Sequence, residues 1–162
     1  MRAPCCLDHQ NVFVSIQGTS VFGLNNKASL IVPVDLIQAS TNVPTTALID
    51  SGAQGNFINT TLAQRFEMAI LDDAIECQNV NGSPNADGNI TQYTWLKVMI
   101  GPQLFYIKFN IANLGHERVI LGDTWLQEIN PRIIWLTQWL IILQKCFHKH
   151  YLGKEGLWQF MR

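Results

Sequence analysis

The chain has 162 residues, of which 48% are hydrophobic and 14% charged, and its formal net charge at pH 7 is −1. This length fits a single domain, and the hydrophobic content suffices to bury a core, which excludes an intrinsically disordered chain. A net charge near zero, without any run of lysines or arginines, gives no electrostatic basis for binding nucleic acid or an anionic membrane. We therefore expect a folded domain with neither of these partners.

The N-terminal stretch "MRAPCCLDHQ" lacks the apolar region of a secretory signal, so we expect an intracellular, cytoplasmic protein. The most apolar segment, residues 133–143, contains Thr137 and Gln138. It is shorter than the roughly 18 to 20 residues that a membrane-spanning helix needs. We interpret it as a strand or an interface.

The four cysteines, Cys5, Cys6, Cys77 and Cys146, have irregular spacing that fits neither a disulfide framework nor a paired zinc motif. The stretch "CFHKH" at residues 146–150 brings three potential metal ligands together but matches no known closed site. We therefore expect no metal and no cofactor.

In chain order, the hydrophobic residues within positions 1–26 show no clear helical or strand period, and we interpret this segment as a leader of uncertain order. Residues 28–40 are rich in β-branched and aliphatic side chains and predict a strand, with Pro33 placing its middle at an edge or a bulge. After a turn, residues 45–50 predict a second strand that ends at Asp50.

Residues 51–56, "SGAQGN", predict a loop whose two glycines permit a tight reversal. A short helix should follow, capped by Asn59 or Thr60. Its apolar positions at helical spacing are Leu62, Phe66 and Ala69.

Two strands, at residues 74–80 and 89–100, are expected next, joined by the turn-rich segment 81–88 into a long hairpin. Further strands are predicted at residues 103–112, 117–122 and 132–135. A second helix at residues 123–129 should be capped by Asp123 and should bury one face, made of Trp125, Leu126 and Ile129. The fold class is therefore mainly β with one or two short helices.

Three segments in the same order resemble retropepsin-type aspartic proteases. Residues 48–58, "LIDSGAQGNFI", resemble the catalytic loop, and residues 119–135, "VILGDTWLQEINPRIIW", resemble the later segment in which a glycine precedes a short helix. Between them, "NVNGSPNADGNIT" falls where the flap hairpin belongs. In detail the sequence is most similar to the protease domains of Ty3/gypsy retrotransposons, including sushi-type elements and host genes derived from them.

This resemblance implies a closed-barrel-like retropepsin fold over residues 27–136, followed by an apolar and basic tail at residues 137–162. It also implies that Asp50 is the catalytic residue. Ser51 would then form hydrogen bonds across a dimer axis, Gly52 would let backbone approach the carboxylates, and Ala53 would leave space for the substrate. The structural positions behind the loop would be Ile120, Leu121 and Gly122. The flap that covers the substrate would be centred on Asn81, Gly82 and Ser83.

The chemistry explains why such a site needs two chains. Peptide hydrolysis by carboxylates requires one ionised group to take a proton from water and one protonated group to donate to the scissile carbonyl. Two carboxyl groups held close together share one proton because their repulsion raises one pKa. The sequence contains a single Asp-Ser-Gly. We therefore expect a two-fold homodimer that pairs Asp50 with its symmetry mate.

Two other interpretations remain open. Asp50 could simply cap its own turn, which is a common use of Asp before Ser-Gly. Related elements also carry Asp where this chain has Ile134, and the segment after Trp135 is unusually apolar. The predicted function is an aspartic endopeptidase that cleaves polypeptides at apolar sites. The alternative is a catalytically silent domain of the same fold that serves as a dimerisation or peptide-binding module.

Overall fold

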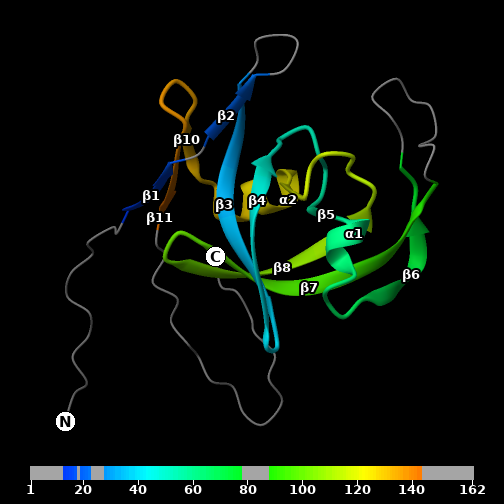
Figure 1. Cartoon of the computed structure of the whole chain (residues 1–162). Helices are drawn as coiled ribbons and strands as arrows, with labels where there is room; N and C mark the ends of the chain where they lie inside the picture. Colours follow the sequence, from blue (N-terminus) through cyan, green and yellow to red (C-terminus); the bar gives the residue numbers. More distant parts are fainter. Residues whose placement is uncertain (1–12, 18, 23–27, 78–87, 144–162) are drawn as a thin grey trace, which may run out of the picture.

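The computed structural model describes residues 13–17, 19–22, 28–77 and 88–143 (Figure 1). In these segments strands predominate and two short helices occur. The strands are β1 Phe13–Gln17, β2 Thr19–Phe22, β3 Ala28–Gln38, β4 Thr41–Ile49, β5 Phe57–Asn59, β6 Ala69–Ile75, β7 Ile90–Ile100, β8 Gln103–Ala112, β9 Val119–Leu121, β10 Arg132–Ile134 and β11 Trp139–Leu143. The helices are α1 Thr60–Ala63 and α2 Asp123–Ile129.

The main sheet closes on itself. Its strand order is β2-β3-β4-β9-β5-β8-β7-β6, and β3 also pairs with β7, which joins two strands that lie far apart in this order. The joining register pairs Asp35 with Met99 and Ile37 with Lys97. The six strands from β3 to β7 therefore form a barrel, and β2 and β6 extend it at either side. The predicted mainly-β, closed-barrel-like fold is confirmed.

The barrel is filled by alternate side chains of its strands, as the two-residue period of a strand requires. On β7, for example, Leu96, Val98 and Ile100 are buried and alternate with more exposed residues. Helix α2 adds Trp125, which is only 1% exposed and packs edge-to-face on Phe105 with ring centroids 5.9 Å apart. The expected apolar face of this helix is confirmed, because its other two members, Leu126 and Ile129, pack against the same core.

A second, three-stranded sheet has the order β1-β11-β10. Strand β11 is its centre, with Leu140 and Ile142 buried in the core of the molecule. Regular structure therefore begins earlier than the sequence indicated, while β11 falls within residues 133–143, which were interpreted as a strand or an interface. The leader expected at residues 1–26 contains β1 and β2, and the tail expected at residues 137–162 contains β11. Pairing between β1 and β11, more than 120 positions apart in the chain, has no local signature in the sequence.

Pro33 lies at a local edge of β3, which is one of the two positions expected for it, and no bulge forms there. The register between β3 and β4 runs without a bulge and pairs Pro33 with Thr46. On the other side of β3, β2 pairs with residues 28–31 and β7 with residues 35–37, so Pro33 falls in the gap between them. Because a proline has no N–H to donate, it fits a position that needs none on that side.

Helix α1 is shorter than its apolar spacing suggested. It begins after Asn59, whose side chain accepts a hydrogen bond from the Thr61 amide at 3.0 Å, so the predicted N-cap is confirmed. The helix ends at Ala63, and Ala69 is exposed at the start of β6. Strand β6 therefore begins at Ala69, earlier than the strand expected at residues 74–80, of which residues 78–80 lie outside the described residues.

Asp123 is not the N-cap of α2, and that expectation was wrong. The N-cap position is Gly122, which supplies no side chain, and Asp123 is the first helical residue. Its carboxylate accepts a hydrogen bond from Gln127 one turn later, at 2.5 Å. An acid in the first turn still favours the helix through its dipole.

A matched pair of leucines tests the packing of the barrel. Leu96 on β7 is fully buried, whereas Leu104 on β8 is 56% exposed. We expect Leu96→Ala to lower the free energy of unfolding by about 2–5 kcal/mol, because it leaves a cavity, and Leu104→Ala to change it by less than about 0.5 kcal/mol. Urea unfolding followed by circular dichroism measures both. Equal losses in the two variants would contradict this assignment of core and surface.

Candidate active site

Asp50 stands directly after β4, at the start of the loop 50–56. Its amide donates a hydrogen bond to the Leu121 carbonyl at 3.1 Å, which continues the parallel pairing of β4 with β9. Its carboxylate Oδ1 accepts a hydrogen bond from the Gly52 amide at 2.9 Å. The Asp50 side chain is half-buried, while Ser51 and Gly52 are exposed. The carboxylate is thus held in a fixed position on an accessible loop.

The backbone of Gly122 passes immediately beneath this loop. A Cβ atom at Gly122 would collide with the carbonyl oxygens of Ala53 and Gly55, so no other residue fits without displacing the loop. The Gly122 amide donates a hydrogen bond to Oδ1 of Asn56 at 3.1 Å. The absent side chain is what permits the close approach of the two chain segments.

The start of α2 holds the loop from the other side. The Asp123 amide donates to the Ala53 carbonyl at 2.7 Å, and the Thr124 hydroxyl donates to the Gln54 carbonyl at 2.8 Å. The free amides at a helix N-terminus need acceptors. Here the Ala53 carbonyl is the acceptor for the Asp123 amide, and together with the Thr124 hydroxyl this bond fixes the loop and the helix to each other.

Asn56 is a residue whose importance the sequence did not reveal, since it was predicted only as the last residue of the loop 51–56. It is 7% exposed, and its side chain satisfies the buried Gly122 amide. Its own carbonyl accepts a hydrogen bond from the Asn110 amide at 2.9 Å, which joins the loop to β8. Through its side chain and its carbonyl, Asn56 therefore connects the loop both to Gly122 and to β8.

Three apolar side chains form a row beside Asp50, across neighbouring strands. The register pairs Leu48 of β4 with Ile120 of β9, and Ile120 with Phe57 of β5. All three are half-buried, whereas the residue that follows each of them is buried in the core. Since side chains alternate along a strand, Leu48 and Asp50 share one face, and the row lies on that face. The alternation was readable in the sequence, but the adjacency of the three strands was not.

The residues predicted for the site are placed as follows. The structure brings Asp50, Ser51, Gly52 and Ala53 together with Leu121 and Gly122, while Ile120 belongs to the apolar row. The flap residues Asn81, Gly82 and Ser83 lie outside the described residues. The strands that flank them, β6 and β7, pair as far as Ile75 and Ile90.

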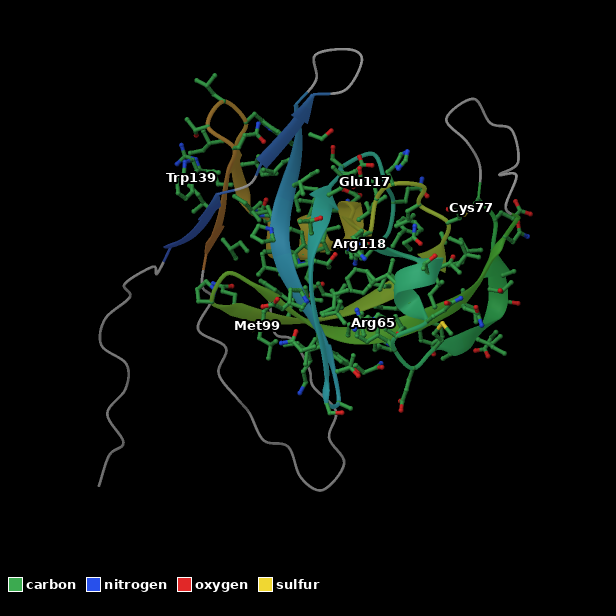
Figure 2. The ribbon with its side chains drawn as sticks, in the orientation of Figure 1. Arg65, Cys77, Met99, Glu117, Arg118 and Trp139 are labelled. Carbon is green, nitrogen blue, oxygen red and sulfur yellow. The ribbon has the colours of Figure 1, made fainter. Side chains whose placement is uncertain are left out.

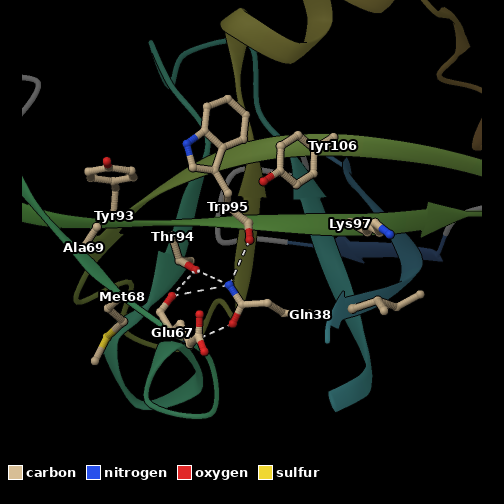
Figure 3. A pocket seen from close by; sticks show the side chains of 10 residues that line it. Gln38, Glu67, Met68, Ala69, Tyr93, Thr94, Trp95, Lys97 and Tyr106 are labelled. Atoms are coloured by element: carbon tan, nitrogen blue, oxygen red, sulfur yellow. Dashed lines mark hydrogen bonds between the residues drawn. The ribbon is translucent and has the colours of Figure 1, made fainter. Parts of the chain in front are cut away.

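Two hollows in the described surface have no part of the loop 50–56 in their walls. The larger, about 450 Å³, lies between the end of β3 and strands β6–β8 (Figure 3). At its base, the Gln38 side chain bonds to the backbone of Glu67 and Trp95, and the buried Thr94 hydroxyl bonds to the Glu67 carbonyl at 2.6 Å. This network ties the β3–β4 turn to β7.

The smaller hollow, about 350 Å³, lies between α1 and the loop before β9. Its walls include Arg65, Glu117 and Arg118, which Figure 2 labels. Neither hollow adjoins Asp50. A single copy of the chain presents Asp50 on a loop at the surface, outside the walls of both hollows.

In the described part of the chain, no group of three or more His, Cys, Asp or Glu side chains is arranged to hold a metal ion. The candidate ligands Cys146, His148 and His150 fall outside that part. No helix among the described residues is long and apolar enough to cross a membrane.

Comparison with solved structures defines the class of the fold. A retropepsin-like aspartic protease from Rickettsia conorii superposes with a TM-score of 0.53 at 18% identity, covering 81% of this chain and 89% of that one. The retroviral protease-like domain of Ddi1 from Leishmania major matches with a TM-score of 0.46 at 18% identity, covering 72% and 95%. The EIAV protease, in complex with the inhibitor HBY-793, matches with a TM-score of 0.42 at 16% identity, covering 70% and 98%. The fold is that of the retropepsins.

The sequence identifies the family within that class. Residues 46–150 match the model of the PEG10/RTL1 protease domain, which covers more than half of the chain. The chain belongs to this family, and the predicted resemblance to a retropepsin-type domain of a gypsy-derived gene is confirmed.

Two glycines of this region test the contact beneath the loop. We expect Gly122→Ala to lower the free energy of unfolding by about 2 kcal/mol or more, because its Cβ would press into the Ala53 and Gly55 carbonyls. Gly55→Ala is the control, since the Cβ added there would meet its nearest atom, Nδ2 of Asn110, at an ordinary 3.4 Å. Thermal unfolding measures both. A Gly122→Ala protein as stable as the Gly55→Ala protein would show that the approach is not tight.

Proposed function

We propose that the protein is an aspartic endopeptidase that acts as a homodimer, in which the two Asp50 carboxyls activate water between them. The observation that carries the proposal is the position of Asp50. Its carboxylate stands on an exposed loop that is braced from beneath by Gly122 and Asn56, in a chain that belongs to a protease-domain family. A carboxylate that only capped its own turn would not need this second layer of support.

The proposed reaction requires the two carboxyls in different protonation states. The ionised one takes a proton from water while the protonated one donates to the oxygen of the scissile carbonyl, and a tetrahedral intermediate forms. The C–N bond then breaks as the amine leaves with a proton. Ser51 would bond across the dimer axis, and the Gly52 amide already donates to Oδ1. Ala53, half-buried beside it, would border the substrate backbone.

The substrate class follows from the surface beside the carboxylate. Leu48, Ile120 and Phe57 offer an apolar floor on the face that carries Asp50. An extended polypeptide with apolar side chains next to the scissile bond would bury them there. The segment around Asn81, Gly82 and Ser83 would close over it as a flap. We propose that residues 27–136 form the protease domain. Strand β11, in the segment that follows, would support this domain through its pairing with β1 and β10.

Cleavage of a peptide library by the purified chain tests the proposal. We expect hydrolysis next to apolar residues and its inhibition by a pepstatin-type compound. Asp50→Asn should reduce kcat by about 100-fold to 10,000-fold, because an amide cannot exchange the required proton. Asp123→Asn is the control, since Asp123 lies in α2 and accepts a bond from Gln127.

Cleavage that survives Asp50→Asn would overturn the proposal. A folded dimer that binds extended apolar peptides without cutting them would instead support the alternative, a peptide-binding module of the same fold. Peptide binding is therefore measured in parallel by fluorescence anisotropy.

A further inference from the structure

The apolar row beside the loop 50–56 continues across two more strands. Phe57, the last member of that row, pairs with Asn110 of β8, and Asn110 pairs with Tyr93 of β7. Residues that pair directly across neighbouring strands share one face of the sheet. The Asn110 side chain lies along this face, since a Cβ added to Gly55 would be 3.4 Å from its Nδ2 atom and 3.6 Å from the Phe57 ring. One continuous face therefore leads from the loop to β7.

The far end of this face carries a positioned positive charge. Lys108 of β8 pairs with Trp95 of β7, and its Nζ lies 4.3 Å from the centroid of the Tyr93 ring. Attraction to the ring holds the ammonium group there. Residues 90–112, which form β7, β8 and the turn between them, contain Lys97 and Lys108 but no aspartate or glutamate. This hairpin is therefore basic, although the net charge of the whole chain is −1.

Aromatic rings border the Lys108 ammonium and leave it accessible. Figure 3 shows Tyr93, Trp95 and Tyr106 on one side of the hairpin and Thr94 on the other. Trp95 and Tyr106 stack with their ring centroids 4.9 Å apart and are 42% and 66% exposed, and Lys108 is exposed as well. Surroundings of low polarity strengthen the attraction between an ammonium and a carboxylate. A polypeptide segment that carries a carboxylate between apolar side chains fits this chemistry.

The length of the face sets where along a bound polypeptide that carboxylate falls. In the order of the strands, four steps separate Leu48 from Tyr93, and two steps separate Phe57 from Tyr93. At about 4.8 Å a step, these distances are about 19 Å and about 10 Å. An extended chain covers them with about six and about three residues. The carboxylate therefore belongs well outside the residues that flank Asp50.

We propose that Lys108, positioned by Tyr93, binds an acidic side chain of the polypeptide about three to six residues from the bond to be cleaved. The inference rests on the proposed function, since an extended polypeptide on the apolar row is what brings a chain segment to this end of the face. It adds a requirement for charge to the apolar preference. Lys108 contacts the acidic side chain, whereas Tyr93 is a positioning residue that holds the ammonium.

Matched peptides test the acidic-residue site. Each is fluorescein-labelled and apolar at its centre, and carries either glutamate or glutamine at one position about three to six residues from that centre, on either side. All proteins carry Asp50→Asn, so that the peptides stay intact, and fluorescence anisotropy gives the Kd. We expect a glutamate peptide to bind about fivefold more tightly than its glutamine counterpart, because an accessible ion pair contributes up to about that factor. The ratio should fall towards one at high salt.

Lysine variants show whether the preference is local. We expect Lys108→Gln to bind the two peptides equally. Lys97→Gln is the matched control and should keep the preference, because Lys97 has the same charge on the same hairpin but lies four positions along β7 from Tyr93. Tyr93→Phe keeps the ring and should keep the preference, whereas Tyr93→Ala should reduce it about twofold while the charge remains. Circular dichroism confirms that each variant is folded.

The inference is overturned if no glutamate peptide binds more tightly than its glutamine counterpart, if the preference survives Lys108→Gln, or if Lys97→Gln abolishes it equally. The two proposals fail separately. A Lys108-dependent preference in a chain that retains Asp50 but cuts neither peptide refutes the protease and leaves the acidic-residue site. A protease that binds and cuts both peptides equally well does the opposite.

Discussion

The contact between the loop 50–56 and the chain at Gly122 is the constraint on which the rest of the candidate site depends. The Gly122 amide donates a hydrogen bond to the Asn56 side chain of the loop, and the Asp123 amide and the Thr124 hydroxyl donate to loop carbonyls. The approach is possible only because Gly122 has no Cβ. Through this contact a short loop between two strands acquires the rigidity that the proposed role of Asp50 needs.

The barrel supplies the frame for that contact. Strand β9 lies between β4 and β5, so the segment that ends at Gly122 is inserted between the two strands that begin and end the loop. Parallel pairing of β9 with β4 aligns Ile49 with Leu121, and the next residues along the two strands are Asp50 and Gly122. The same alignment places Leu48 beside Ile120. One register thus sets both the position of the carboxylate and the apolar surface next to it.

A single chain nevertheless presents only half of the proposed chemistry. One carboxylate cannot both accept and donate the proton that peptide hydrolysis requires. Asp50 lies at the surface of the single chain, next to the exposed Ser51 and Gly52.

By itself, the sequence determined the strand that ends at Asp50, the loop with its glycines, the Asn59 cap and the apolar face of α2, because these depend on local period and turn chemistry. Only the tertiary structure decided what depends on distant pairing. It closed the barrel through β3 and β7, placed β1 beside β11, and made Asn56 the partner of the Gly122 amide. It also cut α1 short and moved the helix cap from Asp123 to Gly122, and the Ala53 carbonyl of the loop accepts the hydrogen bond of the first amide of α2. Local patterns specify elements, whereas the contacts that hold the loop 50–56 come from segments about 70 residues away in the chain, which no local pattern encodes.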